Sequence, residues 1–379
     1  MTWPCDVVVH AAAASVTNAG AILIAEMLAI SDYNCAMRLL PFALLAACHS
    51  PANGGHGPDS GPSDSGVIDT TPNQWVWVEI PGSTCANGTP AGFGINRATS
   101  GSDLFVYFQG GGACWDANTC FVLKTAINTT TTYGPANLAT DVAVLDVDRS
   151  WNAALANASF VFVPYCTADL HAGTNVKDYM VAGQMPIHHT GGTNAQLFVD
   201  ALHATFPDAA NIWVSGSSAG GYGATLNFLR FADAWPSASL ALLEDSSPFI
   251  PVYANYGLWQ SSWNLAFPTG CADCASDLTA AFDTVVAAQP ASRVGLLTWD
   301  NDATITAYFG YTGPIAEAQS ALITSHFDHA QTHVFELAGT SHTMLGQLAT
   351  LAQPAGGVSL TTWVTQWLTG DDAWATVGN

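Results

Sequence analysis

The sequence predicts an α/β fold in which a mostly parallel β-sheet is flanked by helices. Short apolar segments recur along the chain without alternating polar residues, which is typical of strands buried on both faces. They occupy residues 103–109, 158–165, 211–216, 240–245 and 293–300. Longer stretches of helical character lie between them, such as 194–206 and 224–235. This alternation of strand and helix favours parallel strands joined by covering helices.

The N-terminal segment is predicted to be a targeting signal. The sequence MRLLPFALLAAC, from Met37 to Cys48, has one arginine, a short apolar core and LAAC at its end. It resembles a bacterial lipoprotein signal in which residues 37–47 are removed and Cys48 is lipidated. The apolar run is too short to span a bilayer. We therefore expect translation to begin at Met37, with residues 1–36 a misannotated extension. A buried apolar helix in a domain that starts at residue 1 is the alternative.

Residues 48–73 are predicted to form a disordered tether. Proline, glycine, serine and aspartate dominate this segment, so it cannot bury enough apolar surface to offset its ordering entropy. The sequence WVWVEI at 75–80 opens the first strand, and no second linker or internal repeat follows. Residues 74–379 are therefore expected to be one catalytic domain. The protein is predicted to be an exported lipoprotein of the bacterial cell envelope, held to the outer membrane or cell surface by a lipid on Cys48.

Cysteine usage agrees with export. Six cysteines follow Cys48, and an even number in an exported chain indicates disulfides. Cys271 and Cys274 form a C-x-x-C pair, which could be a redox motif or half of a zinc site. No second C-x-x-C accompanies it, so a local disulfide is favoured over a metal site. We expect neither a metal nor an organic cofactor.

The sequence GSSAGG at 216–221 predicts a reaction centre. Read as G-x-S-x-G, it follows an apolar strand and precedes a helix, which is the arrangement of the nucleophile elbow in α/β-hydrolases. The flanking glycines permit a sharp turn that holds the central serine out of the sheet. Ser218 is then the nucleophile, Ser217 is not, and the N–H of Ala219 faces a developing oxyanion. A simple small-residue turn is the alternative.

A second oxyanion donor is expected from the sequence YFQGGGACWD at 107–116. Three glycines follow a predicted strand upstream of the elbow, which is where lipases and esterases place their second donor loop. Gly111 and Gly112 are the candidates.

The acid and the base of a triad are expected after the serine, in the order Ser, acid, His. His342 follows the predicted strand near residue 334 and precedes a terminal helix, which makes it the candidate base. Asp302 is the preferred acid because it lies further past its strand than Asp300, the second choice; Asp245 is the third. The other histidines are expected to have packing, pocket or surface roles: His188, His189, His326, His329 and His333.

Several blocks together resemble the pectin acetylesterase/Notum family of serine hydrolases. They are TCANGTPAGFGIN, FQGGGACWDANTC, FVFVPYCTADLHAG, HHTGGTNAQ and VSGSSAGGYGA, in this order over about residues 75–345. The resemblance implies an α/β-hydrolase fold and removal of acyl groups from esters. It implies Ser218 as nucleophile, Gly111, Gly112 and Ala219 as oxyanion donors, one aspartate at 300–302 as acid and His342 as base. Around WDNDATI and GTSHTML the sequence is more similar to bacterial members.

The resemblance also bears on disulfides and on the substrate pocket. It supports the pairs Cys114–Cys120 and Cys85–Cys166, whereas proximity alone supports Cys271–Cys274. Residues that flank the motifs could line the pocket or could serve packing: Trp115, Asp116, Tyr165, Asp169, His189 and Tyr222.

The function predicted is a serine carboxylic ester hydrolase that deacetylates a polysaccharide or a small acyl ester through an acyl-enzyme. A polyester or lipid-type esterase is one alternative. A catalytically inactive surface-binding lipoprotein is another, and the complete Ser–Asp–His set weighs against it. The formal net charge of −22 excludes a nucleic-acid partner, because phosphates would be repelled. The same charge predicts that neutral acetylated glycans or small esters are better substrates than acetylated polygalacturonate.

Overall fold

The computed structural model describes residues 66–142, 149, 153–252, 254–327, 329–347 and 354–378. The predicted upstream extension, the signal, the lipidation position Cys48 and most of the predicted tether lie outside these residues. The end of the predicted tether is packed rather than disordered. Ile68 is fully buried, and its N–H donates a hydrogen bond of 3.0 Å to Oγ1 of Thr205. The packed body therefore begins before the predicted boundary at residue 74, because the apolar side chain of Ile68 is already buried.

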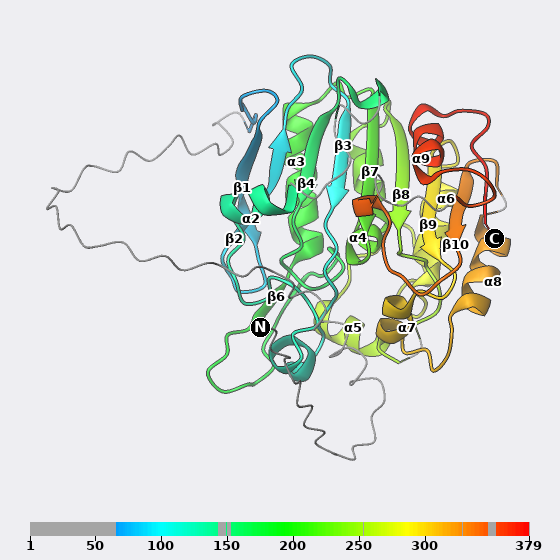
Figure 1. Ribbon diagram of the computed structural model, residues 1–379. Helices are drawn as coiled ribbons and strands as arrows, with labels where there is room; N and C mark the ends of the chain where they lie inside the picture. Colours follow the sequence, from blue (N-terminus) through cyan, green and yellow to red (C-terminus); the bar gives the residue numbers. More distant parts are fainter. Residues whose placement is uncertain are drawn as a thin grey trace, which may run out of the picture. The chain divides into compact units, whose positions relative to one another are not determined.

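An eight-stranded, mostly parallel sheet forms the centre of this body (Figure 1). Its strands run in the order β1 (Trp75–Thr84), β2 (Pro90–Asn96), β4 (Ser159–Val163), β3 (Leu104–Phe108), β7 (Asn211–Ser217), β8 (Ser239–Asp245), β9 (Arg293–Trp299) and β10 (Thr332–Leu337). All pairs from β4 to β10 are parallel, and β2 is antiparallel to both of its neighbours. A separate hairpin pairs β5 (Asn175–Lys177) with β6 (Ile187–His189). The five predicted apolar segments coincide with β3, β4, β7, β8 and β9.

Successive residues of the central strands point to opposite faces of the sheet and build two apolar cores. Val214, Leu242, Leu296 and Val334 belong to the larger core. The neighbouring residues Trp213, Leu243, Leu297 and Phe335 belong to the smaller core. Both faces of the sheet are covered, and for this reason the sequence of each central strand is a continuous apolar run.

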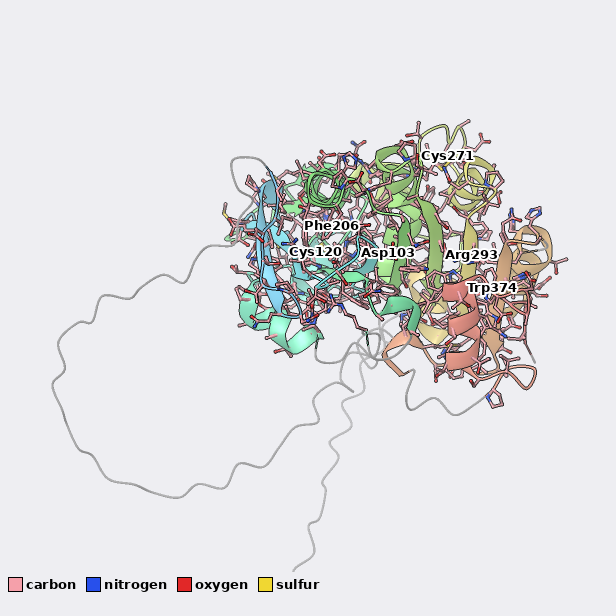
Figure 2. All side chains as sticks on the ribbon, turned by 90° about the horizontal axis from the view of Figure 1, so that it is seen from above. Asp103, Cys120, Phe206, Cys271, Arg293 and Trp374 are labelled. Atoms are coloured by element: carbon pink, nitrogen blue, oxygen red, sulfur yellow. A yellow bond between two sulfur atoms is a disulfide. The ribbon has the colours of Figure 1, made fainter. Side chains whose placement is uncertain are left out.

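Helices cover both faces of the sheet (Figure 2). On one face α4 (Ala219–Ala234) contacts β7 and β8 and packs against α3 (Gly191–Thr205) and α6 (Thr279–Ala288). On the other face α9 (Leu360–Thr369) inserts Trp363, Trp367 and Leu368 into the smaller core. Helices α3 and α4 begin earlier than the predicted residues 194 and 224. Each starts within a glycine-rich segment, and the low helix propensity of glycine is the reason why the first turn was not predicted from the sequence.

Four further α-helices and three short helices lie among the described residues. They are α2 (Pro135–Asp141), α5 (Tyr256–Trp263), α7 (Ala303–Phe309), α8 (Ala316–His326) and the short helices Asn118–Val122, Ala153–Leu155 and Leu345–Gln347. Within the part of the chain that the structure describes, no helix is both long enough and apolar enough to cross a membrane.

The three predicted disulfides are all present. Cys85–Cys166 joins the segments that follow β1 and β4, Cys114–Cys120 closes a loop after β3, and Cys271–Cys274 closes a short turn. Because β1, β3 and β4 point in the same direction, the first two crosslinks lie at the carboxyl edge of the sheet. That edge is where ligands bind in open α/β sheets.

Candidate active site

The turn between β7 and α4 holds Ser218 in a strained conformation. Its φ of 56° and ψ of −126° lie in a region that residues with a Cβ atom rarely adopt. A Cβ atom on Gly216 would lie 2.2 Å from the carbonyl oxygen of Gly220, and one on Gly220 would lie 2.0 Å from that of Phe108. The two glycines are therefore required by steric contact, and the turn is the strand–serine–helix elbow that the sequence predicts.

The glycine loop after β3 lies directly beside this turn. A Cβ atom on Gly110 would approach the carbonyl oxygen of Ser217 to 2.3 Å, and Gly112 has a φ of 78°. The loop is held from its far side, where Ile127 N–H donates to the carbonyl oxygen of Gly111 and Ala113 N–H donates to that of Thr125.

This arrangement leaves several N–H groups available next to Ser218. Gly111 and Gly112 donate no hydrogen bond to any described residue through their own N–H groups. The N–H of Ala219 is the first of α4 and has no acceptor within the helix. Together they form a set of donors suited to a developing oxyanion.

The residue before the glycine loop is fixed by four hydrogen bonds. Gln109 donates its N–H to Val163, accepts the N–H of Tyr165 on Oε1 and donates Nε2 to Asp141. Its carbonyl oxygen lies 2.8 Å from Nε2 of His171. Burial lowers the pKa of His171 to about 4, so the imidazole is neutral at pH 7 and donates this bond from Nε2. The loop is therefore positioned before any substrate arrives.

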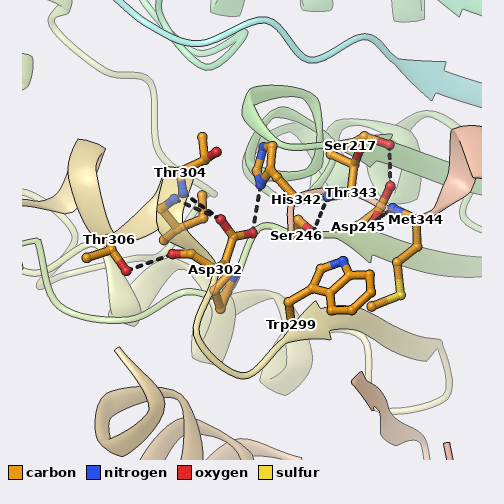
Figure 3. A network of polar contacts seen from close by, with 12 residues as sticks. Ser217, Asp245, Ser246, Trp299, Asp302, Thr304, Thr306, His342, Thr343 and Met344 are labelled. Atoms are coloured by element: carbon orange, nitrogen blue, oxygen red, sulfur yellow. Dashed lines mark hydrogen bonds and ion pairs between the residues drawn. The ribbon is translucent and has the colours of Figure 1, made fainter. Parts of the chain in front are cut away.

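Asp302 and His342 form a hydrogen-bonded pair at the ends of β9 and β10 (Figure 3). Oδ2 of Asp302 lies 2.7 Å from Nδ1 of His342, and its Oδ1 accepts the N–H groups of Thr304 and Ile305 at the start of α7. Asp302 is fully buried. Asp300, the second choice from sequence, instead accepts the N–H of Gly339.

The pair sets the tautomer of the imidazole. Nδ1 faces a carboxylate oxygen and therefore carries a proton, which leaves a lone pair on Nε2. Nε2 of His342 is buried and has no hydrogen-bond partner among the described residues. A basic nitrogen with its lone pair free is what a general base requires.

Asp245, the third choice of acid, makes no hydrogen bond to the imidazole in the described structure. Its carbonyl oxygen accepts the N–H of Ser218 at 2.7 Å. Its carboxylate accepts the N–H groups of Met344 and Leu345 at 2.8 and 2.9 Å. The serine turn and the loop of His342 are thus both attached to one residue.

A small apolar cavity of about 20 Å³ adjoins Ser218. Its walls are Gly112, Ala113, Leu170, Ser218, Ala219, Tyr222, Trp259, Ile305, Tyr308 and Phe309. Of the pocket residues proposed from sequence, Tyr222 is in this set. Sequence reasoning missed the contributions of α5 and α7. The sequence did contain a signal for α7, because residues 303–309 directly follow Asp302, the preferred candidate for the acid, and must therefore begin near the site. Trp259 of α5 has no motif near it that could indicate its place.

The other proposed pocket residues lie behind or beside the cavity. Trp115 packs against Trp259 and Tyr308, with ring centroids 5.8 and 6.2 Å apart. Tyr165 packs against the glycine loop, since a Cβ atom on Gly111 would approach its ring to 3.0 Å. Both therefore shape the walls without facing the cavity.

Asp116, Asp169 and His189 have structural roles. Asp116 accepts the N–H and the hydroxyl of Thr119 within the disulfide loop. Asp169 is fully buried, and its carboxylate accepts the N–H of Gly191 at the start of α3. Burial raises the pKa of Asp169 to about 6. Both carboxylates, of Asp116 and Asp169, are thus used in hydrogen bonds within the protein.

His189 and the two cysteines of the Cys114–Cys120 disulfide form a group of three residues of types that bind metals elsewhere. One ligand atom from each of these residues lies within 4.8 Å of the others. Both cysteines are oxidised and supply no thiolate, so this group does not fit a zinc ion. Nδ1 and Nε2 of His189 instead lie 3.0 and 2.9 Å from Thr167 O and Tyr179 Oη.

The chain is similar in sequence to one family of esterases. The family profile described as Pectinacetylesterase matches residues 74–266. The mouse protein "Palmitoleoyl-protein carboxylesterase NOTUM" is 26% identical over 177 residues, which cover 44% of this chain and 34% of that protein. The zebrafish "Inactive palmitoleoyl-protein carboxylesterase notum1b" is 30% identical over 97 residues, covering 25% of this chain and 68% of that protein. The chain thus spans about a third of the length of the full-length curated relatives that it matches.

A solved structure of the Wnt deacylase Notum from Drosophila has a similar fold. It superposes with a TM-score of 0.60 at 17% sequence identity and covers 80% of this chain and 96% of its own. This similarity confirms the α/β-hydrolase fold predicted from sequence.

The buried histidines predict how stability depends on pH. Burial lowers the pKa of His171 and of His189 to about 4, whereas a histidine in an unfolded chain has a pKa of about 6.5. Between about pH 6.5 and 4 the unfolded chain binds protons that the folded chain does not, so these residues destabilise the fold as pH falls. Asp169 acts in the opposite direction below about pH 6, because the folded state keeps its proton.

We expect the variant His189→Gln to flatten this dependence. The slope of the unfolding free energy against pH, measured by urea denaturation between pH 4.5 and 6.5, should decrease by up to about 1.4 kcal/mol per pH unit. The variant Tyr179→Phe removes the hydrogen bond to His189 but keeps the imidazole, and should retain the steeper slope. Equal slopes in wild type and His189→Gln would contradict the assignment of His189 as a buried neutral group.

Proposed function

The chain belongs to the pectinacetylesterase family, and on this premise we propose that it is a serine carboxylic ester hydrolase that removes short acyl groups. The observation that carries the proposal is the strained turn of Ser218 together with an imidazole whose Nδ1 is held by Asp302, on a loop that Asp245 ties to that turn. No other serine in the described residues combines a left-handed turn after a sheet strand with the first position before a helix next to a glycine loop.

The proposed reaction is acyl transfer through an acyl-enzyme. His342 accepts the proton of Ser218 on Nε2 while the serine oxygen attacks the ester carbonyl. The N–H groups of Gly111, Gly112 and Ala219 stabilise the oxyanion that forms. His342 returns the proton to the leaving alcohol, and water then hydrolyses the acyl-enzyme by the same route. Asp302 orients the imidazole and stabilises its cation, so this chemistry requires no cofactor.

The size of the cavity favours a short acyl group. A cavity of about 20 Å³ has room for a group about as large as one water molecule. Its walls are almost entirely apolar side chains, which suits a methyl group. Trp259, Tyr308 and Phe309 are among the side chains that line it. We therefore favour acetyl as the acyl group, in contrast to the palmitoleoyl group named for the curated relatives.

The alternatives are less well supported. A lipid-type esterase needs room for a long acyl chain, and an esterase of polyesters needs room for a hydroxyacyl unit. An inactive binding protein would not need a buried Asp302–His342 pair, although one relative carries the name inactive.

Three disulfides are typical of an exported protein. Lipid attachment at Cys48 stays a prediction, because it lies outside the described residues.

A neutral acetylated glycan is the substrate class that the charge favours. The net charge is −22, and the arginines of the described body already donate to protein groups: Arg97 to Asp69, Arg149 to Asn96, Arg230 to Gln196 and Arg293 to Trp367. Lys124 and Lys177 are the remaining cations of the described body. A polyanionic glycan would therefore meet a repulsive field with few local basic groups to offset it.

The first prediction concerns the triad. Ser218→Ala should fold and lose at least about three powers of ten in kcat on a chromogenic acetate ester, because the nucleophile is removed. Asp302→Asn should lose a comparable amount, since the amide no longer fixes the tautomer of His342. The matched controls are Ser217→Ala and Asp300→Asn, each expected to keep activity within about tenfold. Full activity of Ser218→Ala would exclude the proposed mechanism.

The second prediction concerns acyl length. On one series of esters, kcat/KM should decrease by at least about tenfold from acetate to butyrate, because the extra methylenes exceed the space of a cavity of about 20 Å³. Trp259→Ala should raise the ratio of butyrate to acetate activity by removing one of its walls. Trp263→Ala truncates the neighbouring stacked ring, which does not line the cavity, and should leave the ratio unchanged. A wild type that prefers butyrate or longer esters would show that the cavity is not the acyl site.

The third prediction concerns charge. Acetate release from acetylated xylan should exceed release from acetylated pectin at low ionic strength. The difference should narrow with added salt as repulsion is screened, since the Debye length falls from about 30 Å at 0.01 M to about 8 Å at 0.15 M. A clear preference for pectin that added salt does not increase would show that net charge does not select the substrate.

A further inference from the structure

We propose that Asp245 is a positioning residue, which fixes the loop of His342 against the turn of Ser218. It acts through backbone groups and does not contact the reacting atoms. The inference rests on the proposed esterase function, because it assigns these two residues as base and nucleophile. It also explains why a second buried aspartate lies next to a site whose imidazole is already paired with Asp302.

Asp245 is the last residue of β8, and both its backbone and its side chain are used. Its side chain is fully buried. The pairing of Ser217 with Asp245 in the sheet brings its carbonyl oxygen to the N–H of Ser218, at 2.7 Å. Its carboxylate accepts Met344 N–H on Oδ1 and Leu345 N–H on Oδ2. A single residue therefore defines the positions of both catalytic segments.

The next residue adds a second attachment for the same loop. Oγ of Ser246 accepts the N–H of Thr343 at 2.8 Å, and Thr343 has a φ of 60°. Three successive N–H groups, from Thr343 to Leu345, thus bind Asp245 and Ser246. Figure 3 shows Thr343 and Met344 beside these two residues. Without these acceptors the N–H groups would lose their hydrogen bonds to Asp245 and Ser246, which costs about 1–3 kcal/mol for each donor that is left buried and unpaired.

The carboxylate is itself held from the opposite side. Oγ of Ser217 donates to Oδ2 of Asp245 at 2.7 Å and accepts the hydroxyl of Tyr107 at 2.9 Å. Three donors therefore converge on the carboxylate: one hydroxyl and two backbone N–H groups. A carboxylate offers only acceptors and satisfies all of them, whereas an amide presents an NH₂ group to at least one donor.

The geometry of general-base catalysis explains why this attachment is needed. The bond to Asp302 holds the imidazole at Nδ1 only, and the ring could still pivot about that end. The backbone that follows His342 decides where Nε2 lies, and Asp245 ties this backbone to the turn of Ser218. A misplacement of about 1 Å in such a site costs on the order of 100-fold in rate.

The test compares Asp245→Asn with a matched change at the neighbouring carboxylate. Glu244 is also fully buried, but its side chain accepts the hydroxyl of Thr225 on α4 and does not contact the loop of His342. We expect Asp245→Asn to lower kcat on an acetate ester about 100-fold with KM within about twofold. We expect Glu244→Gln to leave kcat unchanged.

A spectroscopic measurement separates positioning from stability. The proton between His342 Nδ1 and Asp302 should give a far-downfield ¹H resonance in wild type and in Glu244→Gln. In Asp245→Asn this resonance should broaden or disappear while circular dichroism shows a folded protein. If Asp245→Asn keeps both kcat and the resonance and only unfolds at a lower temperature, Asp245 is a structural residue and the proposal is wrong.

Two further outcomes of these experiments also bear on the proposal. If Asp245→Asn does not fold, Ser246→Ala tests the same attachment by removing the acceptor of Thr343 alone; kcat should fall about tenfold with KM unchanged, and full kcat would overturn the proposal. If the wild type hydrolyses no ester, the proposed function fails. The downfield resonance still tests the positioning role in that case, because it does not depend on turnover.

Discussion

The close approach of three backbone segments at the end of β7 is the constraint on which the site depends. Gly220 touches the carbonyl oxygen of Phe108, Gly216 touches that of Gly220, and Gly110 touches that of Ser217. Any Cβ atom at these glycines would separate the segments. Because they touch, the strain at Ser218 is maintained, its hydroxyl stands at the start of α4, and the glycine loop after β3 lies within reach of it.

The parallel sheet makes this convergence possible. Strands β3, β7, β8, β9 and β10 all end at one edge, and each contributes a loop or residue to the site. Register then decides which residues meet. Phe108 pairs with Gly216, and Ser217 pairs with Asp245. A shift of one residue between β7 and β8 would place Glu244 where Asp245 lies and would direct the wrong side chain to the loop of His342.

Buried polar groups around the site serve mainly to hold loops. Gln109, Asp169 and Asp245 each accept or donate several hydrogen bonds to backbone groups of segments distant in sequence. Such groups are costly to bury unless every partner is present. These hydrogen bonds position the loops of the site, and its small apolar cavity is lined by aromatic side chains that pack on one another.

Much of the fold and part of the site could be predicted from sequence, for local physical reasons. Continuous apolar runs identify strands buried on both faces, and the glycines around Ser218 and at 110–112 indicate backbone turns that only glycine permits. The order of serine, acid and histidine along the chain follows from the order of the strands. These features depend on residues close together in the sequence, so the sequence by itself determined them.

The tertiary structure alone decided which of the three aspartates meets His342 and what encloses the cavity. Asp300 and Asp302 are two residues apart in one loop, and only the turn into α7 directs Asp302 to the imidazole and Asp300 to Gly339. Trp259 reaches the cavity from a helix 41 positions after Ser218. The role of Asp245 depends on hydrogen bonds to residues about 100 positions away. Such contacts depend on how distant segments pack, and local sequence patterns carry no information about that packing.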